Sequence, residues 1–179
     1  LLYWNNDSVD LPLPMHTFFL RQFYLNNALT KPGSMSVCGV PIDLRNIDIP
    51  LYFFAAEGDH IVPWLAVYSG LPLYGNAQER RFVLGESGHN AGAINPVTKD
   101  RRSYWTGNTE GKSAEEWRAT AENHKGSWWK DLNTWLSSRS GNLVNAPKTL
   151  GNSSHKPQAD APGEYVRAQA MNVVKAHLV

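Results

Sequence analysis

The sequence has little cysteine, no long apolar run and no excess of charge of either sign. Its single cysteine, Cys38, excludes an internal disulfide and a metal site built from several cysteines, which fits a reducing compartment. No run of 18 apolar residues is present, so the sequence predicts no membrane-spanning helix. Lys and Arg number 17 and Asp and Glu number 16, which gives a formal net charge of +1. The chain therefore has no large excess of positive charge with which to bind nucleic acid or an anionic membrane.

The 179 residues are the length of one domain or of a large part of one. Apolar residues make up 42% of the chain, which is enough for a packed core. Aromatic residues make up 11% and include seven Trp, which indicates large buried or contact surfaces. The first five residues include no Met and lack the pattern of a signal peptide. We therefore expect the chain to be a segment of a longer protein.

Two short apolar runs bounded by turn residues predict buried strands at residues 49–56 and 81–84. Between them, residues 62–73 suit a helix, with Pro63 in its first turn. A strand, a helix and a strand at this spacing predict two parallel strands joined by a crossover. Both strands end at polar residues, and the carboxyl edge of an open α/β sheet is where ligands and catalytic groups lie.

The region before these strands carries weaker patterns. Residues 17–25 are apolar on both faces of a helix, which predicts a short, well-buried helix. Residues 35–40 alternate loosely and predict a short strand, and residues 40–43 predict a turn.

The region after these strands opens with a capping box at Ser113 and Glu116, which predicts the start of a helix. An apolar stripe at steps of three or four residues then predicts one helix, or two helices because Gly126 interrupts it. The stripe consists of Trp117, Ala121, His124, Trp128, Leu132 and Trp135. We expect this stripe to cover the sheet as core. After residue 137 the composition predicts an extended tail, and residues 165–179 suit either a terminal helix or disorder.

Asp59 and His89 each follow directly after one of the two predicted strands. In α/β-hydrolases the chain order is nucleophile, acid and histidine, with the last two on successive strand ends. There the histidine takes a proton from the nucleophile, and the carboxylate holds the imidazole in one tautomer. The pattern leaves a second interpretation open, because an acid after a strand often caps a helix and a Gly-rich turn often carries a histidine.

No Gly-x-Ser-x-Gly or Gly-x-Cys-x-Gly elbow, which would hold the nucleophile, occurs in the sequence. Cys38 lacks the flanks of an elbow, and we expect it to be a buried core residue. We expect Ser87 to shape the loop that presents His89, and His60 to make a structural hydrogen bond in preference to contacting a substrate. The nucleophile is therefore expected upstream of Leu1.

Long ungapped strings at residues 59–64 and 81–96 contain Asp-His-Ile-Val-Pro-Trp and Gly-Glu-Ser-Gly-His. Shorter blocks accompany them at residues 1–5, 37–39, 124–129, 135–136 and 161–166. Together these strings resemble the C-terminal part of the catalytic domain of the polyhydroxyalkanoate synthases, over almost the whole chain. The block Gly126-Ser127-Trp128-Trp129 is similar to class I, which polymerises short 3-hydroxyacyl units. Asn90 and a slightly longer stretch at residues 70–80 depart from the family pattern.

The resemblance implies the α/β-hydrolase fold, of which this chain would hold the C-terminal half, with parallel strands and flanking helices. It places part of a cap or lid region at residues 1–34. Residues 35–140 would form the C-terminal half of the core, and residues 141–179 an extended tail.

The resemblance also implies polymerisation of short-chain (R)-3-hydroxyacyl-CoA into polyester, with release of CoA. The nucleophile would be an upstream Cys, and His89 its general base. Asp59 would either orient His89 or help to deprotonate the incoming 3-hydroxyl group. No metal or bound cofactor is implied, because the CoA thioester supplies the activation, and the segment alone is expected to be inactive.

The resemblance implies a cytoplasmic, granule-associated protein, expected to be a homodimer, whose partners are the acyl-CoA, the growing polyester and the granule surface. An apolar groove for the polyester is a second interpretation of the Trp-rich stripe. Two alternatives remain open. A lipase or esterase of the same fold would carry a Ser elbow upstream, and a non-catalytic granule-associated module would not need His89.

Overall fold

The computed structural model describes residues 10–164 of the chain. The chain divides into two compact units, of which Leu13–Gly141 contains every helix and strand in the described residues. The described part of the other unit, residues 10–12 and 142–164, forms turns and bends without a helix or strand. The terminal helix or disorder predicted for residues 165–179 lies outside the described residues. Within residues 10–164, no helix has the length and apolar character needed to cross a membrane.

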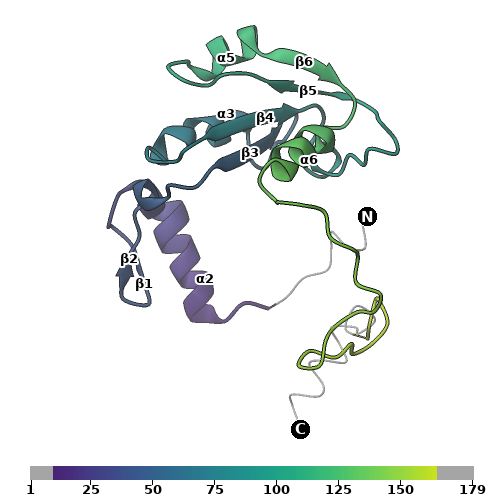
Figure 1. Ribbon diagram of the computed structural model, residues 1–179. Coiled ribbons are helices and arrows are strands. Elements are labelled where there is room, and N and C mark those ends of the chain that lie inside the picture. Colours follow the sequence, from purple (N-terminus) through teal and green to yellow (C-terminus); the bar gives the residue numbers. More distant parts are fainter. Residues whose placement is uncertain (1–9, 165–179) are drawn as a thin grey trace. The chain divides into compact units, whose positions relative to one another are not determined.

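The main sheet has four strands in the order β3-β4-β5-β6 (Figure 1). Strands β3 (Leu51–Ala56) and β4 (Arg80–Gly85) are parallel, in a register that runs from Leu51 opposite Arg80 to Ala56 opposite Gly85. The crossover between them contains α3 (Trp64–Ser69) and the 3-10 helix η4 (Leu71–Leu73). The predicted unit of strand, helix and parallel strand is therefore confirmed.

The other half of the sheet is antiparallel, and the sequence patterns did not predict it. Strand β5 (Ser103–Thr106) pairs with β4 and with β6 (Glu122–Lys125), antiparallel to both. Helix α5 (Ala114–Thr120) lies between β5 and β6 in the chain and begins at the predicted capping box. Antiparallel strands of four residues are too short to show a clear alternating pattern.

The stripe from Trp117 to Trp135 covers two helices, as the alternative based on Gly126 predicted, but a strand that was not predicted separates them. Residues Glu122–Lys125 form β6, so His124 lies on a strand, and α6 (Trp129–Ser137) begins only after it. Ala121 already has an extended backbone, and Gly126 has a φ of +97°. Pairing with β5 satisfies the backbone groups of residues 122–125, and this pairing overrides the helical spacing of the side chains.

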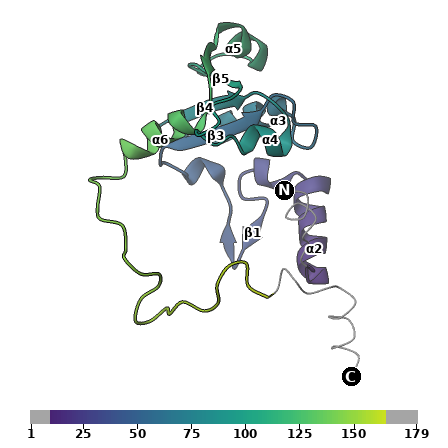
Figure 2. The same ribbon diagram turned by 90° about the vertical axis from the view of Figure 1, so that its right-hand side faces the viewer.

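The two faces of the sheet pack against different helices. On one face Phe53 and Phe82 meet α3 and α5, and the core includes Tyr68 and the fully buried Trp117. Successive side chains of a strand point to opposite faces, so Tyr52 and Phe54 of β3 lie on the face opposite to Phe53. The Trp-rich stripe thus contributes to both faces: Trp117 is part of the buried core, whereas the partly buried Trp128 and Trp135 pack on Phe54 and Tyr52. Helix α4 (His89–Ala93) also contacts β3, with α6 nearby (Figure 2).

The first helix begins earlier than predicted and is not buried. Helix α2 (Leu13–Phe19) continues as the π-helix η1 (Leu20–Leu25), and neither contains a buried residue. Pro14 fits in the first turn, where its missing N–H is not needed. Apolar spacing indicates burial only where another surface covers the helix, and Leu13 and Tyr24 remain 74% and 84% exposed. A 3-10 turn, η2 (Ala28–Thr30), follows.

The predicted strand at 35–40 and turn at 40–43 are replaced by a hairpin. Strands β1 (Ser36–Val37) and β2 (Val40–Pro41) are antiparallel, and Cys38 and Gly39 form the turn between them. Both turn residues have positive φ, 50° and 79°, as a tight two-residue hairpin requires. Cys38 is exposed, so its predicted place in the core is wrong. The 3-10 helix η3 (Leu44–Asn46), which begins after the cap at Asp43, leads on towards β3.

Candidate active site at the ends of the parallel strands

The loops after β3 and β4 lie at the same edge of the sheet because the two strands are parallel and end in register. The Glu57 N–H donates to the Gly85 carbonyl at 2.8 Å, and the Gly58 N–H donates to the Ser87 carbonyl at 2.9 Å. The strand pairing thus continues into both loops. A Cβ at position 58 would lie 3.2 Å from the Ser87 oxygen, so glycine allows this close approach. The two loops are consequently joined before either functional side chain is reached.

Asp59 and His89 meet at this edge. His89 Nδ1 lies 2.8 Å from Asp59 Oδ2, and Asp59 Oδ1 accepts hydrogen bonds from the N–H groups of Ile61 and Val62 at 2.9 and 3.0 Å. The Asp59 side chain is 9% exposed and that of His89 is 42% exposed. Both carboxylate oxygens are therefore engaged, one by the imidazole and one by two backbone amides.

These contacts determine the charge of the acid. The pKa of the Asp59 carboxyl is lowered to about 2, chiefly by the hydrogen bond from Val62, with further lowering from His89 and Ile61. An ionised carboxylate can only accept hydrogen bonds, so the proton of the contact belongs to Nδ1 of His89. In the neutral tautomer this leaves Nε2 as an acceptor, which is the state that a general base requires.

The chain around His89 has a tight local conformation. Ser87 has a φ of +88°, Gly88 precedes α4 as its N-cap, and His89 is the first residue of that helix. The Ser87 carbonyl also accepts the hydrogen bond that joins the two loops. The prediction that Ser87 shapes the loop presenting His89 is therefore confirmed.

Two other sequence-derived candidates, Cys38 and His60, take no part in the hydrogen bonds of this pair. Cys38 is exposed in the β1–β2 turn, which belongs to a separate two-stranded sheet and not to the sheet that carries Asp59 and His89. His60 is exposed, and its side chain makes no hydrogen bond to another residue of the described part, so the structural bond expected for it is not found there.

A charged pair that the sequence patterns did not indicate involves a residue close to Asp59. Glu57, two residues before Asp59, accepts two hydrogen bonds from Arg118 of α5, at 2.9 and 3.1 Å. The Arg118 guanidinium also lies over the Trp105 ring, 4.0 Å from its centre. The partners are 61 residues apart, and the only local signal was an acid at the end of a predicted strand.

Asp59 and His89 lie outside three cavities of the described part of the chain, whose volumes are about 380, 370 and 130 Å³. Among residues 10–164, no group of three or more His, Cys, Asp and Glu side chains is placed to hold a metal ion. A partly exposed imidazole whose Nδ1 bonds a buried carboxylate is the arrangement that general-base catalysis uses.

No protein-family model matches the chain. Among curated proteins, the poly(3-hydroxyalkanoate) polymerase subunit PhaC of Cupriavidus necator is 46% identical over 170 residues, which are 95% of this chain and 28% of that protein. Poly(3-hydroxyalkanoate) polymerase 2 of Ectopseudomonas oleovorans is 40% identical over 93% of this chain and 29% of its own length. The polymerase subunit PhaC of Rhizobium meliloti is 39% identical over 95% of this chain and 27% of its own length.

The chain thus spans less than a third of the length of these curated relatives. The similarity nevertheless runs through nearly all of its 179 residues, including both strand ends described above. By sequence, the chain therefore belongs to the poly(3-hydroxyalkanoate) polymerase family and corresponds to one part of the longer proteins in it.

Proposed function

We propose that this chain is a segment of a polyhydroxyalkanoate synthase with the α/β-hydrolase fold, which polymerises short-chain (R)-3-hydroxyacyl-CoA and releases CoA. The observation that carries the proposal is the 2.8 Å contact between His89 Nδ1 and Asp59 Oδ2 at the ends of two parallel strands. The names of the related proteins supply the substrate class. Asp59 and His89 are the acid and base of a Cys-His-Asp triad, and the Cys lies upstream of this chain.

In the first step of this mechanism, Nε2 of His89 takes the proton of the cysteine thiol. The thiolate attacks the carbonyl carbon of the acyl-CoA, and the tetrahedral intermediate collapses by breaking the bond to the CoA sulfur. CoA leaves with the proton returned by His89, and the acyl group remains on the enzyme as a thioester. In the next step a 3-hydroxyl group attacks that thioester while His89 takes its proton. The bond between the acyl carbon and the cysteine sulfur breaks, His89 returns the proton to that sulfur, and the polyester gains one ester bond.

The contacts of Asp59 favour the orienting role over direct deprotonation of the 3-hydroxyl group. One carboxylate oxygen bonds the imidazole, and the other accepts from two backbone amides. A carboxyl whose pKa is lowered to about 2 is also a weak base. Its electrostatic contribution is to stabilise the imidazolium that forms when His89 takes a proton.

The cofactor requirement, location and partners proposed for the enzyme follow from the same resemblance. The enzyme needs no metal or cofactor, because the substrate thioester is already activated. It acts in the cytoplasm at the surface of polymer granules, as a homodimer, on the acyl-CoA and the growing polyester chain.

The test uses the full-length protein that carries this segment and measures the release of CoA from 3-hydroxybutyryl-CoA. We expect His89→Ala to lower the rate by about 10²- to 10⁴-fold, the contribution typical of a general base. His155→Ala, at an exposed histidine in residues 142–164, is the matched control and is expected to retain the parent rate.

Two outcomes would contradict the proposal. An unchanged rate in His89→Ala would indicate a module in which His89 has no catalytic part. A parent protein that hydrolyses simple esters but releases no CoA would indicate an esterase of the same fold.

A further inference from the structure

The helix that begins with His89 is too short to hold its own position. Helix α4 has five residues, and its last carbonyl groups have no partner further along the helix. Helices of this length are not stable in water without tertiary contacts. His89 is also 42% exposed, so side-chain packing restrains it little. The position of His89 therefore depends on what holds α4.

Three consecutive side chains from another part of the chain bind the backbone just after His89. The Trp128 Nε1–H donates to the Gly92 carbonyl at 3.1 Å, and the Trp129 Nε1–H donates to the Ala93 carbonyl at 3.0 Å. The Ser127 hydroxyl donates to the Asn95 carbonyl. We call Ser127, Trp128 and Trp129 the indole clamp. Their donors satisfy the carbonyl groups that the end of a helix leaves unpaired.

The indole clamp is itself fixed to the sheet. Trp128 stacks on Phe54 of β3 with ring centres 4.0 Å apart and an angle of 19° between the planes. The Ser127 side chain is fully buried. Stacking on a strand and burial of the serine both restrict rotation of these side chains. The donors thus meet α4 from a rigid support.

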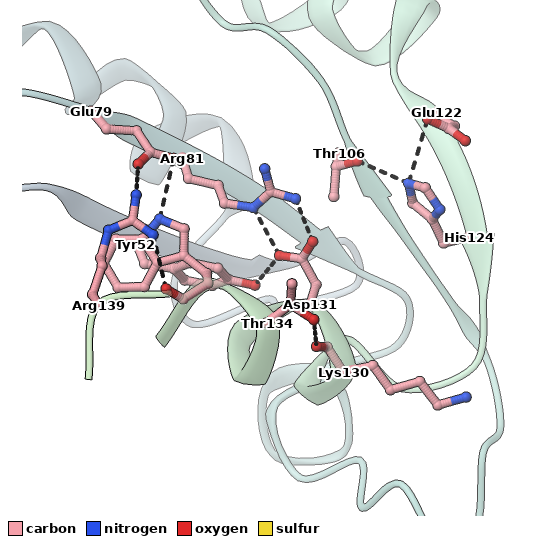
Figure 3. Close-up of polar contacts among 11 residues, drawn as sticks. Tyr52, Glu79, Arg81, Thr106, Glu122, His124, Lys130, Asp131, Thr134 and Arg139 are labelled. Carbon is pink, nitrogen blue, oxygen red and sulfur yellow. Dashed lines mark hydrogen bonds and ion pairs between the residues drawn. The ribbon is translucent and has the colours of Figure 1, made fainter. Parts of the chain in front are cut away.

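Helix α6, which begins at Trp129 of the clamp, is anchored by a separate polar cluster (Figure 3). Asp131 accepts hydrogen bonds from the Tyr52 hydroxyl and from Arg81 Nε, both at 2.8 Å, and forms an ion pair with the same arginine. Burial, followed by the hydrogen bond to Asp131, raises the pKa of the Tyr52 hydroxyl, so that it remains a neutral donor. Both partners of Asp131 lie on the parallel strands, which ties the start of α6 to the strands that lead to Asp59 and His89.

On its sheet side α4 rests directly on β3. A Cβ at position 92 would lie 2.6 Å from the Cβ of Ala56, the last residue of β3, so the glycine permits an approach that no other residue allows. The helix is consequently restrained by this contact and by the donors of the indole clamp.

We propose that Trp128 and Trp129 are positioning residues, which hold α4 so that His89 keeps its hydrogen bond to Asp59. The expected effect on the rate rests on the proposed function. The expected effect on the hydrogen bond between His89 and Asp59 does not. Neither indole needs to touch the substrate, because both act through the backbone of α4.

The test compares two sets of variants in the full-length protein. Trp128→Phe combined with Trp129→Phe keeps an aromatic ring at each position and removes both N–H donors. Trp135→Phe is the matched control, because this indole belongs to α6 and donates its hydrogen bond to Glu79 Oε1 at 3.2 Å, not to the backbone of α4. Trp129→Phe alone is the mildest variant, since Trp129 is already 36% exposed.

We expect the double variant to lower kcat for CoA release about tenfold or more, with KM within about twofold, because a misplaced base loses rate and not binding. Trp135→Phe is expected to retain the parent kcat. The second readout is the downfield proton NMR signal of a histidine Nδ1–H bonded to a carboxylate, assigned by its absence in His89→Ala. This signal should weaken or disappear in the double variant and persist in Trp135→Phe.

The outcomes separate this inference from the proposed function. If the double variant and the Trp129→Phe variant keep both the signal and the kcat of Trp135→Phe, the indoles serve stability alone and the inference is wrong. If the parent protein releases no CoA, the proposed function fails, while the NMR signal still decides whether the indole clamp positions His89.

Discussion

The contact between Gly92 and Ala56 gives the sharpest test of how the fold positions His89. Replacing Gly92 with Ala adds one methyl group, whose carbon would lie 2.6 Å from the Cβ of Ala56. Carbon atoms that are not bonded to each other normally approach to about 3.5–4.0 Å. The end of β3 or α4 must therefore move by about 1 Å. Because Ala56 lies in the sheet, we expect α4 to move, and His89 with it.

The size of the effect follows from this displacement. Overpacking by one methyl group in a closely packed site costs about 1–3 kcal/mol of stability. A misplacement of about 1 Å at a catalytic group can cost about 10²-fold in rate. We therefore expect Gly92→Ala to lower kcat by about 10- to 100-fold while most of the protein remains folded.

The assay measures kcat for CoA release and the midpoint of urea unfolding in the full-length protein. Gly75→Ala is the control, because a Cβ there meets nothing closer than 3.9 Å. The double variant Ala56→Gly/Gly92→Ala moves the methyl group from one partner to the other and should recover much of the lost rate. A Gly92→Ala variant with parent kcat, or a double variant no better than the single one, would refute the reasoning.

The remaining predictions concern charge. In Asp59→Asn, turnover should fall while the fold persists, since the side-chain volume hardly changes. The pKa of Asp59 is lowered from 3.8 to about 2, so its ionised form stabilises the fold above about pH 4, and this stabilisation is lost as the pH falls through 2. Urea midpoints measured from pH 5 to pH 2 should therefore fall more steeply in the parent than in Asp59→Asn; equal slopes would contradict the assigned contacts. Asp131→Asn should cost about 2 kcal/mol, because it weakens a pair in which Asp131 is 13% and Arg81 33% exposed. Glu57→Gln, at the more exposed pair with Arg118, should cost less than about 1 kcal/mol. Urea unfolding distinguishes the two, and equal losses would show that burial does not set the cost.

Local sequence patterns succeeded where neighbouring residues decide the structure. The two buried strands and the crossover between them were predicted from apolar runs and from Pro63. The capping box at Ser113 was also predicted, because its hydrogen bonds join residues three positions apart. The same reasoning placed Asp59 and His89 at one edge of the sheet, where they are in contact.

Local patterns failed where a distant partner decides the structure. His124 has the spacing of a helical stripe, yet it lies on β6 because β5 offers a strand with which to pair. Cys38 is a small apolar residue in the sequence, yet it lies exposed in a hairpin turn with positive φ. The contacts of Glu57 with Arg118 and of Trp129 with Ala93 span 61 and 36 residues, and no local pattern indicates them.

The sequence by itself determined the order of strand, acid, strand and histidine, and with it the edge at which the two polar side chains lie. Two strands joined by a crossover helix pair in parallel, and one continuous stretch of sequence contains both strands and the crossover. Tertiary structure alone decided how firmly the histidine is held, because its short helix gains its support from indoles and from Ala56, which are remote along the chain. Hydrogen bonds and close contacts between remote segments arise only when the sheet has brought those segments together.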